Sequence, residues 1–142
     1  HNIDQLKILL IDDESTTRLI IGKMFIDLGV QTITCISSEE AMDLYIKNNV
    51  GFDLIIIDII LSHNTNGFDL AKEIRTRELY NNVPIVGISS SDPECDTSIF
   101  NIFVKKPLSI ENLIDILELK HKNDKKLKDK EKEKEKEKEK EN

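Results

Sequence analysis

The sequence predicts an α/β protein built on a parallel, doubly wound sheet, and three observations support this prediction. Five short apolar segments alternate with five segments whose apolar residues recur at helical spacing. Residues 52–57 are apolar at nearly every position, which is typical of a strand that helices cover on both faces. Crossovers between parallel strands are almost always right-handed, so the predicted sheet is doubly wound.

The predicted elements follow one another in order along the chain. The strands are 7–11, 31–36, 52–58, 84–88 and 99–104. The helices are 18–28, 38–45, 67–74, a short stretch that begins with Asp92 and Pro93, and 110–117. Capping signals support these boundaries, because Ser, Thr and Asp before a helix and Gly after it satisfy unpaired backbone groups. The other capping residues are Ser15, Thr16, Ser37 with Glu40, Ser109, and Gly29 at the end of the first helix.

The chain divides into a folded domain, residues 1–119, and a charged segment, residues 120–142. The charged segment has 11 Lys against 8 Asp and Glu, and its only apolar residue is Leu127, so it cannot bury a core. Opposite charges at i,i+3 favour a helix, whereas like charges at i,i+4 oppose it. We therefore expect a disordered or frayed helical tail.

Charge and cysteine content exclude several classes of protein. The net charge is -7, and the tail contributes +3, so residues 1–119 carry -10. An acidic body argues against direct binding to nucleic acid or anionic membrane and fits a site for a metal cation. No apolar run is long enough to insert into a membrane. Cys35 and Cys95 lack metal-ligand spacing, which favours reduced thiols in a cytoplasmic protein.

Polar side chains follow the predicted strands at one edge of the sheet. Asp12 and Asp13 follow the first strand, Asp58 ends the third, Ser89 follows the fourth and Lys106 the fifth. Carboxylates that converge at one edge need a cation, and an all-oxygen set suits Mg²⁺. A nearby hydroxyl and ammonium would bind an oxyanion. This constellation predicts phosphoryl transfer onto Asp58, with the metal neutralising charge on the transferring group.

Four motifs in this order identify a family. They are KILLIDDESTTR, DLIIID with a loop that ends in Asn66-Gly67, PIVGIS, and FVKKP. Over residues 6–119 the chain resembles the receiver domain of two-component response regulators. The resemblance implies a flavodoxin-like strand order 2-1-3-4-5 and a phosphoryl donor that is a histidine kinase or a histidine phosphotransfer protein. It also implies that Asp12, Asp13, Asp58 and the backbone carbonyl of Ile60 bind Mg²⁺.

The same resemblance assigns three further positions. Ser89 matches the hydroxyl residue that hydrogen-bonds the phosphoryl group, and Lys106 matches the lysine that contacts it. Phe103 matches an aromatic switch residue, although an ordinary core Phe is an equally good interpretation. Side chains two positions after the acceptor and after Ser89 modulate hydrolysis in this family. The apolar Ile60 cannot orient a water molecule, which predicts slow self-dephosphorylation.

The sequence departs from the family pattern in three places. The loop from Asp58 to Gly67 is one residue longer than usual, and Ser62 stands where Pro is common, so we expect a more flexible loop. The segment between Ser89 and Lys106 is short by more than one helical turn, which leaves only a short fourth helix. The usual output or dimer contact of the family is therefore in doubt.

Two other functions remain open from the sequence. One is a pseudo-receiver, a binding module that keeps the fold and acts without phosphorylation. The other is a different doubly wound enzyme, such as a phosphohydrolase or nucleotide binder, which the absence of a glycine-rich phosphate loop disfavours. No helix-turn-helix or basic DNA-binding helix accompanies the domain. The chain fits a stand-alone regulator or the carboxy-terminal receiver of a hybrid histidine kinase at the cytoplasmic side of a membrane.

Overall fold

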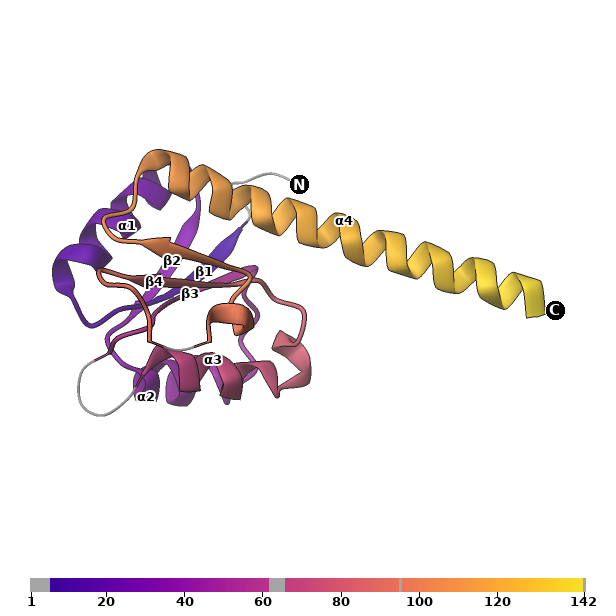
Figure 1. Ribbon diagram of the computed structural model, residues 1–142, viewed down its shortest axis with the longest axis horizontal. Helices are drawn as coiled ribbons and strands as arrows, with labels where there is room; N and C mark the ends of the chain where they lie inside the picture. The colour runs from indigo at the N-terminus through magenta and orange to yellow at the C-terminus, as the bar shows by residue number, and fades with distance from the viewer. Residues whose placement is uncertain (1–5, 62–65, 95, 142) are drawn as a thin grey trace.

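The computed structural model describes residues 6–61, 66–94 and 96–141, and they form a five-stranded parallel sheet (Figure 1). The strand order is β2-β1-β3-β4-β5, so the flavodoxin-like α/β prediction is confirmed. The strands are β1 Lys7–Ile11, β2 Gln31–Cys35, β3 Leu54–Asp58, β4 Ile85–Ser89 and β5 Ile102–Lys105. All five residues of β3 and all five of β4 are buried, as a strand covered on both faces requires.

The helices lie on both faces of the sheet. They are α1 Ser15–Asp27, α2 Ser38–Ala41 with a π-helical turn η2 Met42–Ile46, α3 Gly67–Arg75, and α4 Ile110–Glu141, with 3₁₀ turns η3 Glu78–Tyr80 and η4 Thr97–Ile99. Helices α1 and α4 cover one face, and α2 and α3 cover the other (Figure 1). Within the described ranges, no helix combines the length and apolar character needed to cross a membrane.

The core is aliphatic and divides into two layers on either side of the sheet. Alternate strand residues face opposite ways, so Ile55 and Ile57 pack toward α3 while Leu54 and Ile56 pack toward α1. Cys35 is fully buried in the layer on the α3 side, and burial raises the pKa of its thiol to about 12. Cys95 lies outside the described residues.

Helix α1 begins earlier than predicted and buries a different face. It starts at Ser15 rather than Arg18, and its N-cap residue Glu14 makes no side-chain capping bond. The buried residues are Ile21, Gly22 and Phe25, whereas Leu19 is 74% exposed and Ile20 52% exposed. Apolar residues surround most of this helix, so its sequence did not specify which side meets the sheet.

The predicted fourth helix is replaced by a single 3₁₀ turn in the part of the segment that the structure describes. Asp92 and Pro93 do not start a helix; Asp96 caps η4 instead, its carboxylate accepting the Ser98 N–H at 2.9 Å. The strand β5 accordingly begins at Ile102, not at residue 99. Parallel strands need a crossover of about a dozen residues or more, and residues 90–101 leave no length for a longer helix.

The predicted caps Ser37, Ser109 and Gly29 are confirmed, whereas Ser15 and Thr16 lie within α1 and do not cap it. The Ser37 hydroxyl accepts the Glu40 N–H at 3.1 Å, and the Ser109 hydroxyl accepts the Asn112 N–H at 3.1 Å. Gly29 follows α1 with a positive φ of 79°, the left-handed conformation that favours glycine.

The charged tail continues α4 as one helix, where the sequence predicted disorder or fraying. Leu113 and Ile116 are buried near the start of the helix, and extending an existing helix costs little free energy for Lys and Glu. Lys120 forms ion pairs with Asp124 at 2.8 Å within α4 and with Asp53 at 3.8 Å, just before β3. Beyond Asp124, α4 projects away from the sheet (Figure 1).

A hydrogen-bond network surrounds the amino end of β4, at the opposite end of the strands from the acidic residues. Arg75 donates to the backbone carbonyl of Tyr80 and to Asn101 Oδ1 at 2.7 Å, and the same oxygen accepts the Ile85 N–H at 2.8 Å. The buried Tyr80 hydroxyl donates to the Val50 carbonyl at 2.5 Å. These bonds satisfy backbone groups at the start of β4 and hold the neighbouring loops in place.

Candidate functional site

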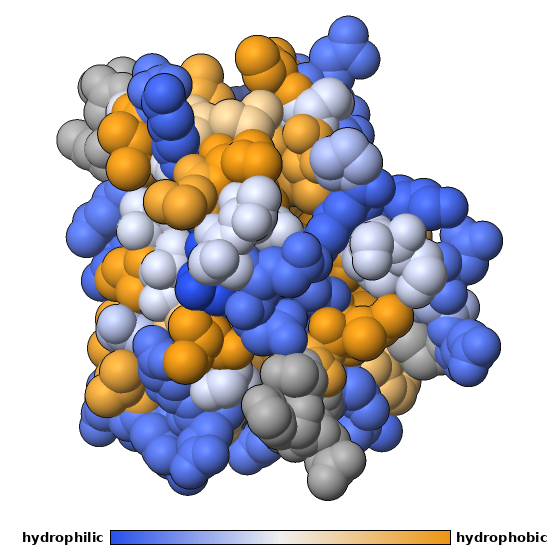
Figure 2. Space-filling view, turned by 90° about the vertical axis from the view of Figure 1, so that its left-hand side faces the viewer, coloured by the Kyte–Doolittle hydropathy of each residue, from blue (hydrophilic) through white to orange (hydrophobic). Residues whose placement is uncertain are grey.

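The predicted polar residues meet at the carboxyl end of the sheet. Asp12 follows β1, Asp58 ends β3, Ser89 ends β4 and Lys106 follows β5. Asp12, Asp58 and Ser89 are buried, although polar side chains are usually exposed. Figure 2 shows the face of the molecule that carries these strand ends, with hydrophilic residues across its middle and hydrophobic side chains around them.

Lys106 is the centre of the site. Its Nζ lies 2.8 Å from Asp12 Oδ2, 2.9 Å from Asp58 Oδ2 and 3.1 Å from Glu14 Oε1, and its side chain is only 8% exposed. Burial lowers the pKa of Lys106, but contacts with these three carboxylates raise it, and the pKa ends above its ordinary value. The ammonium therefore stays charged and offsets the repulsion among the acids.

Asp58 is held by both of its oxygens. Oδ2 contacts Lys106, and Oδ1 accepts the backbone N–H of Ile60 at 2.9 Å. Burial raises the pKa of Asp58 to about 6; Asp12 adds to the rise, and Lys106 and the Ile60 N–H oppose it. Asp58 is thus mostly ionised at neutral pH, as a carboxylate nucleophile must be.

One carboxylate oxygen of Asp12 is buried without a hydrogen bond. Its Oδ1 accepts the Glu14 N–H at 2.8 Å, and its backbone carbonyl accepts from Arg18 at 2.8 Å. Its Oδ2 is buried and lies beside Lys106, but this ion pair lacks hydrogen-bond geometry. A buried carboxylate oxygen without a hydrogen bond is a suitable ligand for a hard cation.

The residues present fit a divalent ion. Asp12, Glu14 and Asp58 each offer a carboxylate oxygen, and these oxygens lie within 4.8 Å of one another. Glu14 is a residue that the sequence interpretation missed as a ligand, although it follows the first strand beside the other two acids. The half-buried Asp13 is not in this group, so its role as a ligand stays a prediction. The same holds for the Ile60 carbonyl.

Gly67 lets the start of α3 lie close to the end of β3. Its N–H donates to the Ile59 carbonyl at 2.8 Å, and Asn66 caps α3 by accepting the Asp69 N–H at 2.7 Å. A Cβ on Gly67 would lie against the backbone carbonyl of Asp58 and 2.6 Å from Ile57 Cγ2. Glycine is therefore required by close backbone approach. Ser62 and its predicted flexibility lie outside the described residues.

Ser89 ends β4, and Phe103 lies in β5 three residues before Lys106. Ser89 is 1% exposed, and its hydroxyl accepts the Ser91 N–H at 3.3 Å. Phe103 is half-buried in β5 and packs against the core layer on the α3 side. These contacts suit the phosphoryl-binding and switch roles, which stay predictions.

Comparison with known proteins agrees with this geometry. The family profile described as the response regulator receiver domain matches residues 8–118. The chain is 27% identical over 116 residues to the sensor histidine kinase CheAY of Helicobacter pylori, covering 78% of this chain and 14% of that one. It is 31% identical over 130 residues to the nisin biosynthesis regulatory protein NisR of Lactococcus lactis, covering 86% of this chain and 53% of that one. The chain thus spans only part of the curated relatives it matches.

Solved structures share the fold. A CheY-like receiver domain from Methylobacillus flagellatus aligns with a TM-score of 0.72 at 22% identity, covering 81% of this chain and 98% of that one. A two-component response regulator from Clostridium difficile aligns with a TM-score of 0.71 at 25% identity, covering 83% and 97%. In both cases nearly the whole neighbouring chain is matched, while this chain extends beyond it.

Proposed function

Because the chain belongs to the response regulator receiver domain family, we propose that Asp58 accepts a phosphoryl group from a phosphohistidine on a histidine kinase or histidine phosphotransfer protein. The observation that supports this proposal most directly is the Lys106 ammonium 2.9 Å from Asp58 Oδ2, inside a cluster of three carboxylates. A purely structural lysine would not need three acids at a sheet edge where ligands bind.

Each residue of the site has a part in the proposed transfer. The P–N bond to the imidazole breaks as a P–O bond forms to the ionised Asp58 carboxylate, which gives an acyl phosphate. Lys106 would bind an oxygen of the incoming phosphoryl group as a point charge. Ser89, whose backbone carbonyl accepts the Lys106 N–H at 2.8 Å, would offer its hydroxyl to a second oxygen. The Ile60 N–H keeps one oxygen of Asp58 in place.

Asp12, Glu14 and Asp58 would hold Mg²⁺, with Asp13 and the Ile60 carbonyl as the further ligands that the family resemblance suggests. When bound, the ion supplies charge neutralisation for the transferring group. The Lys106 ammonium would then move partly away from Asp12, because the ammonium and Mg²⁺ would share the buried Oδ2 of Asp12.

The test is phosphorylation by acetyl phosphate, followed by intact mass, with and without Mg²⁺. We expect a gain of one phosphoryl group that needs Mg²⁺ and is lost in Asp58→Asn. Asp43→Asn is the matched control, since Asp43 is an exposed acid paired with Lys47 at 3.1 Å. Lys106→Gln should still fold but should be phosphorylated at least tenfold more slowly.

The opposite result would favour the pseudo-receiver. A chain that gains no mass from acetyl phosphate in Mg²⁺, and whose amide shifts do not respond to beryllofluoride, would not be a phosphoacceptor. The short β4–β5 connection, with only η4 in its described part, is the feature that would then guide the search for constitutive partners.

A further inference from the structure

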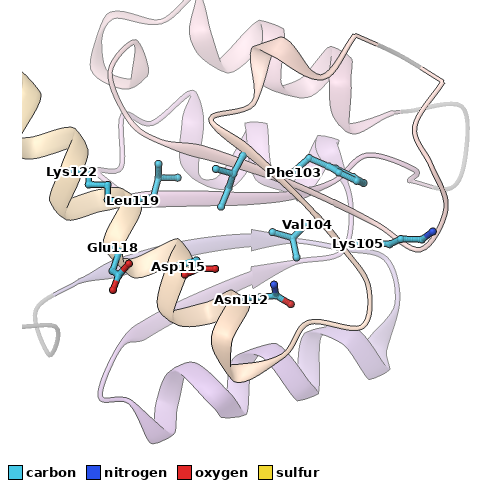
Figure 3. Close-up of a pocket in the computed structure, with 9 residues that line it drawn as sticks. Phe103, Val104, Lys105, Asn112, Asp115, Glu118, Leu119 and Lys122 are labelled. Atoms are coloured by element: carbon cyan, nitrogen blue, oxygen red, sulfur yellow. The ribbon is translucent and has the colours of Figure 1, made fainter.

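The strand β5 leaves one edge of the sheet open. It is the last strand in the order and pairs with β4 alone among the described strands. A hollow of about 520 Å³ runs along it, between the strand and one side of α4. Figure 3 shows Asn112, Asp115 and Leu119 on successive turns of that helix beside the strand. An open edge presents unpaired N–H and C=O groups that can accept another strand.

The ladder determines which backbone groups point outward. Lys106 N–H donates to the Ser89 carbonyl at 2.8 Å, and Ser89 lies opposite Lys105 in the register. Bonds in a parallel ladder alternate, so Val104 also turns its N–H and C=O toward β4. The N–H and C=O of Phe103 and Lys105 therefore face the open edge.

We propose that a second copy of this chain pairs with this edge, antiparallel to β5, so that the two sheets become one. A two-fold axis at Val104 places Phe103 opposite Lys105 of the second copy, and Lys105 opposite Phe103 of the second copy. Each of these pairs exchanges two N–H···O bonds, which gives four in all. This register uses every outward-facing group of Phe103 and Lys105.

The side chains on both faces match in this register. On the α4 side, Val104 meets Val104 of the second copy. On the other face, the Lys105 ammonium lies over the ring of Phe103 of the second copy, a cation–π contact. Among the described residues, Lys105 forms an exposed ion pair with Asp92 at 3.5 Å, and losing such a pair costs little. A lysine on an edge usually excludes other strands, so the same residue disfavours mismatched partners.

Helix α4 also supplies self-complementary groups near the axis. Asn112 Oδ1 accepts the Ser109 N–H at 2.9 Å, so the side-chain NH₂ group points away from Ser109. Asp115 is exposed one turn further along the helix. Across a two-fold axis, a donor and an acceptor on one helix meet the acceptor and the donor of the other, which is the pattern of an isologous interface. The donor and acceptor groups on α4 are therefore compatible with a second copy at this edge.

The test is sedimentation velocity of the full chain from about 10 µM to 1 mM, because a contact this small predicts weak association, with a Kd of roughly 100 µM. Lys105→Pro removes an outward N–H without breaking a bond to β4. Lys105→Gln keeps that N–H and removes the charge. We expect Lys105→Pro to weaken dimerisation about tenfold or more and Lys105→Gln to weaken it about threefold or less.

Amide hydrogen exchange of the wild-type chain gives a second readout that does not depend on a variant folding. The Phe103 and Lys105 amides should become more protected as concentration rises, while the Val104 amide, already bonded to β4, should not change. A single monomeric species up to 1 mM would overturn the proposal and leave the edge to a strand from another protein. A dimer in which the Phe103 amide stays unprotected would overturn it as well.

Discussion

Replacing Asp58 by Asn should stabilise the folded protein at neutral pH in metal-free buffer. The pKa of Asp58 is raised from 3.8 to about 6, chiefly by burial, so the folded state holds this proton to a higher pH than the unfolded state. Protonation of Asp58 therefore favours the folded state. This contribution to the free energy of unfolding is complete below pH 3.8 and is lost as the pH rises to about 6. At pH 7.5 ionised Asp58 therefore costs about 3 kcal/mol, from 1.36 kcal/mol per tenfold change in proton affinity.

Asparagine keeps the shape of the protonated acid and removes this cost. We expect Asp58→Asn to raise the free energy of unfolding by about 1–3 kcal/mol at pH 7.5 and by almost nothing at pH 4. Urea unfolding in EDTA at both pH values measures the difference, with the exposed Asp43→Asn as control. Mg²⁺ should shrink the gain, because a cation compensates the same charge. A less stable Asn variant at pH 7.5 would show that the Lys106 contact outweighs burial and would refute this reasoning.

Three further substitutions test packing and hydrogen bonding in the fold. Gly67→Ala should cost more than about 2 kcal/mol in urea unfolding and should also slow phosphorylation, because its Cβ would press on the strand that carries Asp58; equal stability would contradict the close approach. Gly87→Ala should cost about 1–3 kcal/mol, since its Cβ would lie 3.0 Å from the Phe100 ring, and Phe100→Leu in the same chain should recover part of the loss. Tyr80→Phe should lower thermal stability by about 1–2 kcal/mol through loss of the buried hydroxyl bond while leaving phosphorylation unchanged.

The parts of the structure that follow from short-range rules were predictable. The strand β3 could be placed because an apolar run that ends in one carboxylate fits a buried parallel strand. Asp12, Asp58 and Lys106 could be brought together because parallel strands end at one edge. The Ser37 and Ser109 caps follow from hydroxyl chemistry within four residues.

The features that depend on where side chains and helix faces point in the folded chain were not predictable. Three acids follow β1, and the sequence pattern alone did not indicate that Glu14 contacts Lys106 beside Asp12. Helix α1 is apolar on several sides, so periodicity could not choose its buried face. The Asp92-Pro93 start signal was genuine local chemistry, but the 12 residues between β4 and β5 must also cross between strands. That requirement overrode the local preference.

The projecting part of α4 separates charge in space. The acidic body carries -10 and the segment from residue 120 onward carries +3, and the helix keeps them apart instead of letting the segment fold back (Figure 1). The molecule is therefore a large electric dipole. In dilute salt it should turn its helical arm toward negatively charged surfaces and its strand-end face toward positive ones before any contact forms. At physiological ionic strength the Debye length of about 8 Å confines this orientation to the last steps of approach.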